Sequence, residues 1–595
     1  MPLTAVAVAP VGVLLVATLV LSVWTGTHRV PGAGRSERRP RGAPRLAFAA
    51  AGLAAAFAAA SWQLTAVAGG GSVVVPLWSL APHLPLTIRA DPTAATLLLI
   101  LTVCAGLAGL GRCDRAAWVG PVTLAAVAAG AVAVSAGDLV TLWVGLVLAN
   151  VASFGLAWRA EAPDIPARVW MGAVLTFAAD LGFLAAVLAV WRAVGTTDYA
   201  VIPTGTIAPG LLALLLAPGV VRLAGAWMIP VTGLGGSRGA LPGAGRGWWF
   251  GVTTVPVGLA VIIRVTQLSA GSWPPRPITG GLAALAILVA AAGSATAIWP
   301  RGTVARGVRG SCLAQAGLAL AGFAEGGPDG LVLGTTAALV VAFTVIVLPA
   351  LPGWARAAPG GGLTAVIRLA AASALPPSLG LGVGVLLVAL ASTGARPLGL
   401  AVALTWVGGL PATAATAGAI RRAVTSAPSR ERGPRPAYLG AAAAAGLLVA
   451  AACVPGVVLR IVAPSLVGAG AAGSRLAASH NWISDGIAGV SWPGGDLAVL
   501  LALGGALWWS VGVLGGARAA PGTARGRPSP SGRPDGPTVT EVAAARLRSQ
   551  LGRLLRVGLT TSAQGAGLAA RAIREQPRWL WLTTVAWLAW LLVVR

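Results

Sequence analysis

The sequence has no lysine, and its 595 residues include only 16 acidic residues, four cysteines and three histidines. Charged residues make up 10% of the chain, whereas a soluble globular domain has about 25%. So few charges cannot cover a water-facing surface, which excludes an ordinary soluble protein. The cysteines show no paired spacing, and we find no HExxH, CxxC, P-loop or dinucleotide-binding pattern. We therefore expect no disulfide framework, no metal site, no cofactor and no covalent catalysis by this chain.

Apolar residues dominate instead, at 56% of the chain with a mean hydropathy of +0.83. Apolar runs of roughly 20 residues, the length that spans a bilayer core, recur from end to end. Because backbone groups in lipid must be paired within each span, continuous runs of this kind favour helices. The predicted fold class is an all-α, polytopic transmembrane helix bundle of about 14–16 spans. Its runs begin near residues 3, 46, 94, 117, 139, 169, 207, 248, 278, 311, 330, 378, 397, 437, 496 and 579.

Arginine supplies all 42 basic residues, and the formal net charge is +26. A GC-rich genome explains this bias without invoking function. The charge lies in short loops, so we expect contacts with anionic lipids and no nucleic-acid binding. The positive-inside rule predicts a multi-pass cell-membrane protein with its N-terminus outside. It places 69–92 and 193–206 outside, and the cytoplasmic segments are 28–45, 112–115, 158–168, 301–310 and 421–435.

Composition divides the chain into four predicted regions. Residues 1–515 form the transmembrane bundle, and 516–538 form a disordered linker rich in proline, glycine and arginine. Residues 539–576 follow as an amphipathic helix along the membrane surface or against a partner protein, and 577–595 form a transmembrane anchor. Within the bundle, 228–247 and 370–384 are predicted to be broken helices, or alternatively re-entrant or external loops.

One acidic residue lies in the middle of an apolar run. Asp180 lies about twelve residues into the span that begins near 169. An unpaired carboxylate at this depth in a membrane costs several kcal/mol. It must therefore face the interior of the bundle. Intramembrane acids indicate ion or proton paths, and a structural hydrogen bond to a neighbouring helix is the alternative.

This span resembles the sixth helix of the antiporter-like membrane subunits of respiratory complex I and the Mrp antiporters. The matching positions are Met171, Ala173, Asp180, Leu184, Gly195 and Thr196. The preceding span resembles the fifth helix of that family at Asp138, Leu139, Gly145, Ser153 and Phe154. Residues 88–103 resemble its external hairpin and the helix that follows. Weaker similarities occur at Thr253, Gly258, Arg264, Arg306, Ser311, Gln315, Gly317, Pro376, Pro377 and Gly380.

The resemblance implies the L-type, distal subunit, with its terminal surface helix and anchor, but titratable residues of the family are replaced. Val147 stands at the family glutamate, Arg222 at a lysine, Phe250 at a histidine and Gly384 at a second lysine. A lysine relay cannot operate, because arginine stays charged. A pair between Arg222 and Asp180 is predicted. The resemblance implies a proton or ion path through Asp180, Arg222, Arg264, Asp138, Asn150, Gln315 and Arg368.

Four alternative functions are compatible with these features of the sequence. The first is a proton- or cation-translocating subunit of an NADH-quinone oxidoreductase-like complex, whose partners would be other membrane subunits; any enzymatic activity would belong to the assembled complex. The second is a degenerate, non-conducting scaffold subunit. The third is the membrane half of an inorganic-carbon uptake complex, which would need a soluble zinc partner. The fourth is a solute carrier of another fold.

Overall fold

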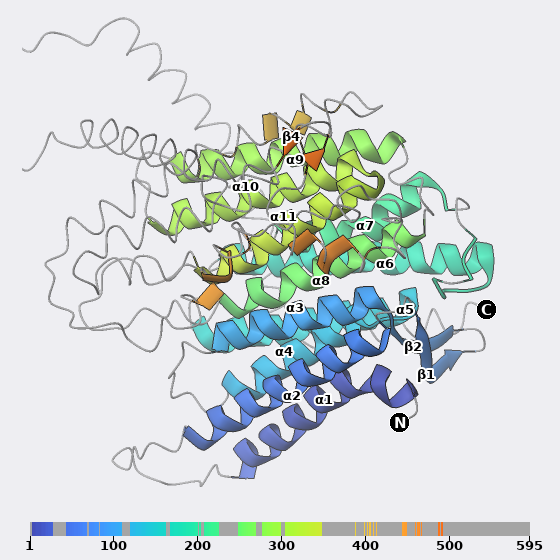
Figure 1. Cartoon of the computed structure of the whole chain (residues 1–595), viewed down its shortest axis with the longest axis vertical. Helices are drawn as coiled ribbons and strands as arrows, with labels where there is room; N and C mark the ends of the chain where they lie inside the picture. Colours follow the sequence, from blue (N-terminus) through green and yellow to red (C-terminus); the bar gives the residue numbers. More distant parts are fainter. Residues whose placement is uncertain are drawn as a thin grey trace, which may run out of the picture.

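The computed structural model describes most of the first 347 residues and a few positions beyond them. The continuous ranges are 3–27, 43–67, 71–81, 84–109, 119–161, 167–199, 201–203, 207–224, 248–268, 276–298 and 304–347, and isolated residues follow between 387 and 491. Within these ranges the chain is a bundle of roughly aligned helices with a small β-hairpin at one end (Figure 1).

Each of the eleven apolar runs predicted before residue 347 is a helix. Their bounds are α1 Leu3–Thr27, α2 Ala43–Val67, α3 Pro92–Gly109, α4 Val119–Val134, α5 Leu139–Glu161, α6 Ala167–Val194, α7 Pro209–Ala224, α8 Trp248–Gln267, α9 Arg276–Ile298, α10 Val304–Glu325 and α11 Gly327–Val347. Among the described residues, α1, α2, α6, α9 and α11 are long and apolar enough to cross a membrane by themselves. The helical bundle predicted from hydropathy is confirmed.

One boundary is wrong. We predicted the span of α10 to begin near residue 311, after the cytoplasmic segment 301–310, but α10 already begins at Val304. Arg309 lies inside this helix and is buried. The arginines hid the helix start in the sequence. An arginine lowers the mean hydropathy of its segment even where its side chain is buried, so the apolar run begins later than the helix.

Several other predictions fall on residues outside the described ranges. These are the segment 228–247, which lies between α7 and α8, the segment 370–384, most residues of the spans after 347 and the terminal regions from 516 onward.

The hairpin closes one end of the bundle. Strand β1 (Val73–Ala81) pairs antiparallel with β2 (Leu84–Ala90), from Val73 opposite Ala90 to Ala81 opposite Leu84. Bridges join Ile88 to Ala136 and Asp138 to Asp198. The hairpin, the α4–α5 turn and the segment after α6 therefore share one end of the molecule, as the predicted sidedness of 69–92 and 193–206 requires. A second, short hairpin pairs β3 (Gly486–Ile487) with β4 (Val490–Ser491).

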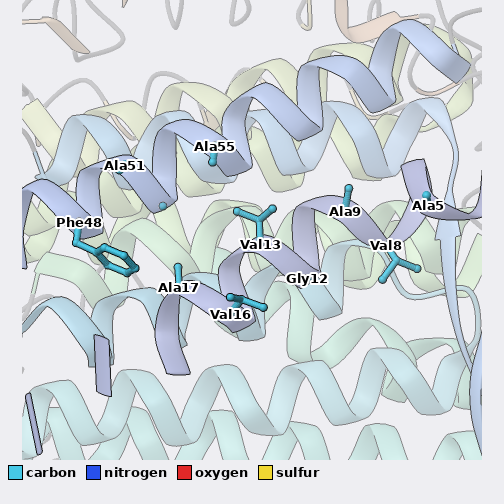
Figure 2. Close-up of a pocket in the computed structure, with 11 residues that line it drawn as sticks. Ala5, Val8, Ala9, Gly12, Val13, Val16, Ala17, Phe48, Ala51 and Ala55 are labelled. Carbon is cyan, nitrogen blue, oxygen red and sulfur yellow. The ribbon is translucent and has the colours of Figure 1, made fainter. Parts of the chain in front are cut away.

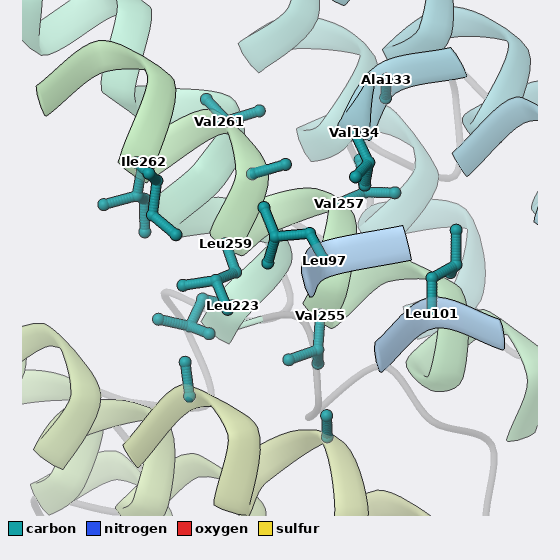
Figure 3. Packing of buried hydrophobic residues seen from close by; sticks show 14 of the residues in the cluster. Leu97, Leu101, Ala133, Val134, Leu223, Val255, Val257, Leu259, Val261 and Ile262 are labelled. Carbon is teal, nitrogen blue, oxygen red and sulfur yellow. The ribbon is translucent and has the colours of Figure 1, made fainter. Parts of the chain in front are cut away.

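Helix α8 lies at the centre of the described bundle. It packs against α3, α4, α5, α7 and α11. Figure 3 shows aliphatic side chains of α8 between those of the surrounding helices, among them Leu97 of α3, Val134 of α4 and Leu223 of α7. Polar groups carried by α8 and its neighbours are thereby held away from lipid.

A groove between α1 and α2 lies away from this centre and has a volume of about 660 Å³. Figure 2 shows its lining, which consists of alanine, valine, glycine and phenylalanine side chains, from Ala5 to Ala17 on α1 and from Phe48 to Ala55 on α2. Because no lining residue is polar or ionisable, this groove is not a candidate ionic site.

Small residues set the spacing of neighbouring helices, as is common in membrane bundles. A Cβ atom on Gly145 of α5 would lie 2.5 Å from the backbone nitrogen of Ala133 in α4. This contact explains in physical terms why a glycine stands at a position of the family pattern.

We expect Gly145→Ala to destabilise the protein by about 1–3 kcal/mol, because the added methyl must separate two backbones. Thermal unfolding in detergent or nanodiscs measures the effect. Gly281→Ala on α9 is the matched control, since its Cβ would meet nothing within 4 Å. Equal melting temperatures for the two variants would contradict the close packing of α4 and α5.

Candidate functional site

Three helices meet at Asp180, whose side chain comes from α6 and is almost completely buried. Arg222 of α7 approaches it with both terminal nitrogens: Nη1 lies 2.7 Å from Oδ1 and Nη2 lies 2.8 Å from Oδ2. Asn150 of α5 donates a hydrogen bond from Nδ2 to the same Oδ2. The predicted ion pair is thus present, in the planar two-bond geometry that suits guanidinium and carboxylate.

Two backbone carbonyls also accept hydrogen bonds from the Arg222 guanidinium. Nη1 of Arg222 donates to the Pro218 carbonyl and Nη2 to the Leu146 carbonyl, both at 3.3 Å. Leu146 belongs to α5, so Arg222 ties α7 to both α5 and α6. The positive charge therefore has neutral acceptors in addition to Asp180.

Two glycines allow α7 to carry Arg222 this deep into the bundle. A Cβ on Gly219 would lie 2.8 Å from the Gly258 carbonyl oxygen, and one on Gly258 would lie 2.9 Å from Cβ of Arg222. Side chains at either position would push α7 away from α8. The glycine at 258, which the family pattern shares, is needed where the two backbones cross.

Hydroxyl groups extend the site toward α8. Ser153 lies one turn beyond Asn150 on α5, and its Oγ is 3.4 Å from Oγ1 of Thr253 on α8. Both side chains are buried. Thr176, one turn before Asp180, instead bonds back to the carbonyls of Gly172 and Ala173 in its own helix.

Arg264 lies in a different ionic cluster, at the hairpin end of α8. Its Nη1 is 2.6 Å from Oδ2 of Asp91 and 3.0 Å from Oε1 of Gln267, and its Nη2 is 3.1 Å from Oδ1 of Asp91. The guanidinium also lies over the ring of Tyr199, at 5.8 Å from the centroid. Arg89 of β2 also contacts Asp91, with its Nε 3.1 Å from the same Oδ2.

Asp91 has a second task as the N-cap of α3. Its Oδ1 accepts the backbone N–H of Ala94 at 2.7 Å, and Pro92 occupies the first helical position. Burial raises the pKa of Asp91, but the charge and hydrogen bonds of Arg264 outweigh it and hold that pKa below its usual range. The carboxylate therefore stays ionised as part of a structural pair.

Asp138 is the N-cap of α5. Its carboxylate accepts four hydrogen bonds, from the backbone N–H and hydroxyl of Thr141 and from the same two groups of Thr87, at 2.6–2.8 Å. Burial nevertheless raises the pKa of Asp138, since desolvation outweighs these bonds. Asp138 fastens the hairpin to α5 and lies about 18 Å along the helix from Asn150, so it is not a direct partner of Asp180.

Of the last two predicted site residues, the structure describes Gln315 but not Arg368. Gln315 lies on α10, is buried, and leaves its Oε1 without a hydrogen-bond partner. Arg368 lies outside the described residues. The structure thus brings Asp180, Arg222 and Asn150 together and assigns Arg264 and Asp138 to the hairpin end.

The sequence matches no protein-family model, and no curated protein matches it either. Solved structures do match. A chain of the Mrp complex from Dietzia sp. DQ12-45-1b superposes with a TM-score of 0.59 at 16% identity, covering 80% of this chain and 99% of that one.

Two further structures match over a similar extent. A chain of the membrane-bound sulfane sulfur reductase, an archaeal respiratory membrane complex, has a TM-score of 0.60 at 17% identity, covering 78% of this chain and 97% of its own length. A chain of respiratory complex I from Thermus thermophilus with bound NADH has a TM-score of 0.59 at 18% identity, covering 79% of this chain and all of that one. This protein has the antiporter-like fold of complex I and Mrp membrane chains. The fold that the resemblance implied is confirmed.

Sequence reasoning missed some participants of these two clusters. Asp91 could have been found, because an acidic residue directly before proline at the start of an apolar run is an N-cap signal. Tyr199 and the Leu146 carbonyl gave no such signal. Their contacts join segments that are far apart in the sequence.

We expect Arg222→Met to destabilise the protein by about 3–5 kcal/mol, because Asp180 would lose its counter-charge in a buried site. The double variant Arg222→Met/Asp180→Leu should recover most of that loss, since it leaves no charge there. Thermal unfolding measures both, and Arg192→Met, at an exposed position of α6, controls for losing an arginine. A double variant less stable than Arg222→Met would argue against a mutually neutralising pair.

Proposed function

We propose that this protein is a proton- or cation-translocating membrane subunit of an NADH-quinone oxidoreductase-like complex. The observation that carries the proposal is the buried cluster of Asp180, Arg222 and Asn150 inside an apolar bundle. An ion pair at such a depth is costly, and hydrophobic residues would fill the space at lower cost. Ionisable groups in spans of this kind are most often part of an ion pathway.

Asp180 is the member of this cluster that can exchange a proton. The amide of Asn150 does not titrate, and a guanidinium keeps its proton at any physiological pH. When Asp180 binds a proton, Arg222 loses its counter-charge but keeps the carbonyls of Pro218 and Leu146 as acceptors. Protonation would therefore loosen the tie between α6 and α7 without leaving the guanidinium unbonded. A loosened tie at this point is a physical means of coupling proton uptake to helix movement.

The comparisons support the same proposal. The solved structures with this fold are parts of an Mrp complex and of respiratory complexes. We infer that this chain likewise works beside other membrane subunits in the cell membrane. Its N-terminus and hairpin end would face outward, and its arginine-rich loops would face anionic lipid headgroups on the cytoplasmic side.

A non-conducting scaffold is the second candidate, and one observation favours it. Arg222 makes two short bonds to Asp180 in place of the family lysine. A fixed, permanently charged partner makes a closed pair more stable than a lysine would. In this alternative the cluster only aligns α5, α6 and α7.

Reconstitution of the whole chain into liposomes with a pH-sensitive dye tests the proposal. Wild type should carry protons, and Asp180→Asn should lower the flux at least tenfold, because an amide cannot bind a proton in exchange. Asn150→Leu should lower it less, since Asp180 keeps Arg222. Arg192→Gln, also on α6 and exposed, should match the wild type.

The same experiment decides between the candidates. Dye responses that are equal for wild type, Asp180→Asn and empty liposomes would refute translocation and favour the scaffold. Flux that Asp180→Asn leaves unchanged would show a path that avoids this cluster.

A further inference from the structure

Several described residues near the hairpin end of the bundle carry polar atoms without hydrogen-bond partners. In the part of the chain that the structure describes, Ser135 Oγ, Thr197 Oγ1, Tyr199 OH and Arg264 Nε are buried and make no hydrogen bond. All four residues are more than nine-tenths buried. Leaving such a group unpaired costs about 1–3 kcal/mol, so four together need an explanation.

Several contacts place these four residues in one region. The carbonyl of Ser135 accepts the backbone N–H of Arg89, 2.7 Å away, and the carbonyl of Thr197 accepts that of Leu139 at 3.0 Å. Tyr199 follows Thr197 by two residues, and its ring lies under Arg264. The α4–α5 turn, the segment after α6 and the end of α8 therefore meet here, beside β2.

Charged groups surround the same region. Burial raises the pKa of the Tyr199 phenol, and the neighbouring charges of Arg264, Asp138, Arg89 and Asp198 shift it in opposite directions. Two arginines and two aspartates thus act electrostatically on the phenol, and both arginines also contact Oδ2 of Asp91. The region is ionic as well as buried, and it is rich in both donors and acceptors.

We propose that this region, defined by Ser135, Thr197, Tyr199 and Arg264, is a binding site for a small cluster of ordered water. Water suits it because three hydroxyls can donate or accept while Arg264 Nε can only donate. A bare cation would meet that N–H and two guanidinium charges. An anion would meet the carboxylates of Asp91, Asp138 and Asp198. Water molecules, each with two donors and two acceptors, pair all four groups without adding charge.

The site would also connect elements that direct bonds leave separate. Water shared by Tyr199, Ser135 and Arg264 would join the segment after α6 to the α4–α5 turn and to α8. It would make the hairpin end a hydrated, ionic layer. This inference does not depend on ion translocation by Asp180.

Whether removing these hydroxyls lowers or raises the melting temperature tests the proposed water site. If Tyr199 OH and Ser135 Oγ bind water, Tyr199→Phe and Ser135→Ala each lose a hydrogen bond, and each should lower the melting temperature by about 2 °C. The double variant should lose less than the sum, because both hydroxyls belong to one network. Thr335→Val is the control. Its hydroxyl on α11 is likewise buried and unpartnered, but it lies outside the cluster, so the melting temperature should stay the same or rise.

Tyr199→Phe and Ser135→Ala that behave like Thr335→Val would overturn the proposal, because removing an unpaired hydroxyl from a dry site is neutral or stabilising. A cryo-EM map of the wild-type protein in nanodiscs, fine enough to show water, gives an independent answer. Density within hydrogen-bond distance of the Tyr199 oxygen supports the site. Well-ordered side chains with no such density refute it.

Discussion

Asp180 and Arg222 neutralise each other inside an apolar bundle, and neither charge could be buried there without the other. The pair needs α6 and α7 at a fixed separation and rotation, because both oxygens of the carboxylate meet both terminal nitrogens of the guanidinium. The neighbouring helices must be positioned to match this pair. Glycines at 219 and 258 let α7 approach α8 closely enough, and the carbonyl of Leu146 and the amide of Asn150 bring α5 into the same arrangement.

The described bundle has two polar layers with different properties. The inner layer around Asp180 holds one carboxylate paired with the permanently charged Arg222. The layer at the hairpin end holds Asp91 and Asp138, both of which cap helices and bind the hairpin. Between them, α5 from Leu142 to Ala149 carries only apolar side chains apart from the ring nitrogen of Trp143. A charge passing from one layer to the other along α5 would cross about two helical turns of hydrocarbon, which separates the hairpin end from the site around Asp180.

Replacement of lysine by arginine changes what such a site can do. In the family that the sequence resembles, a lysine at this position can lose its proton when buried. Arg222 cannot, so Asp180 is the only member of this pair whose charge can change. The two backbone carbonyls near Arg222 become important for this reason, since they are what the guanidinium retains when the carboxylate is neutral.

Much of this architecture was determined by the sequence alone. Hydropathy located every helix from α1 to α11, because a span must be apolar over the thickness of the bilayer whatever it packs against. The depth of Asp180 and the need for a nearby counter-charge followed from the same constraint, and Arg222 was the nearest candidate on the next span. The tertiary structure decided which cation met which anion. Arg264 pairs with Asp91, which lies 173 positions away in the sequence. Asp138 caps a helix, and α10 buries Arg309, whose charge had hidden the start of that helix. These outcomes depend on helix rotation and on close backbone crossings, which no local sequence pattern encodes.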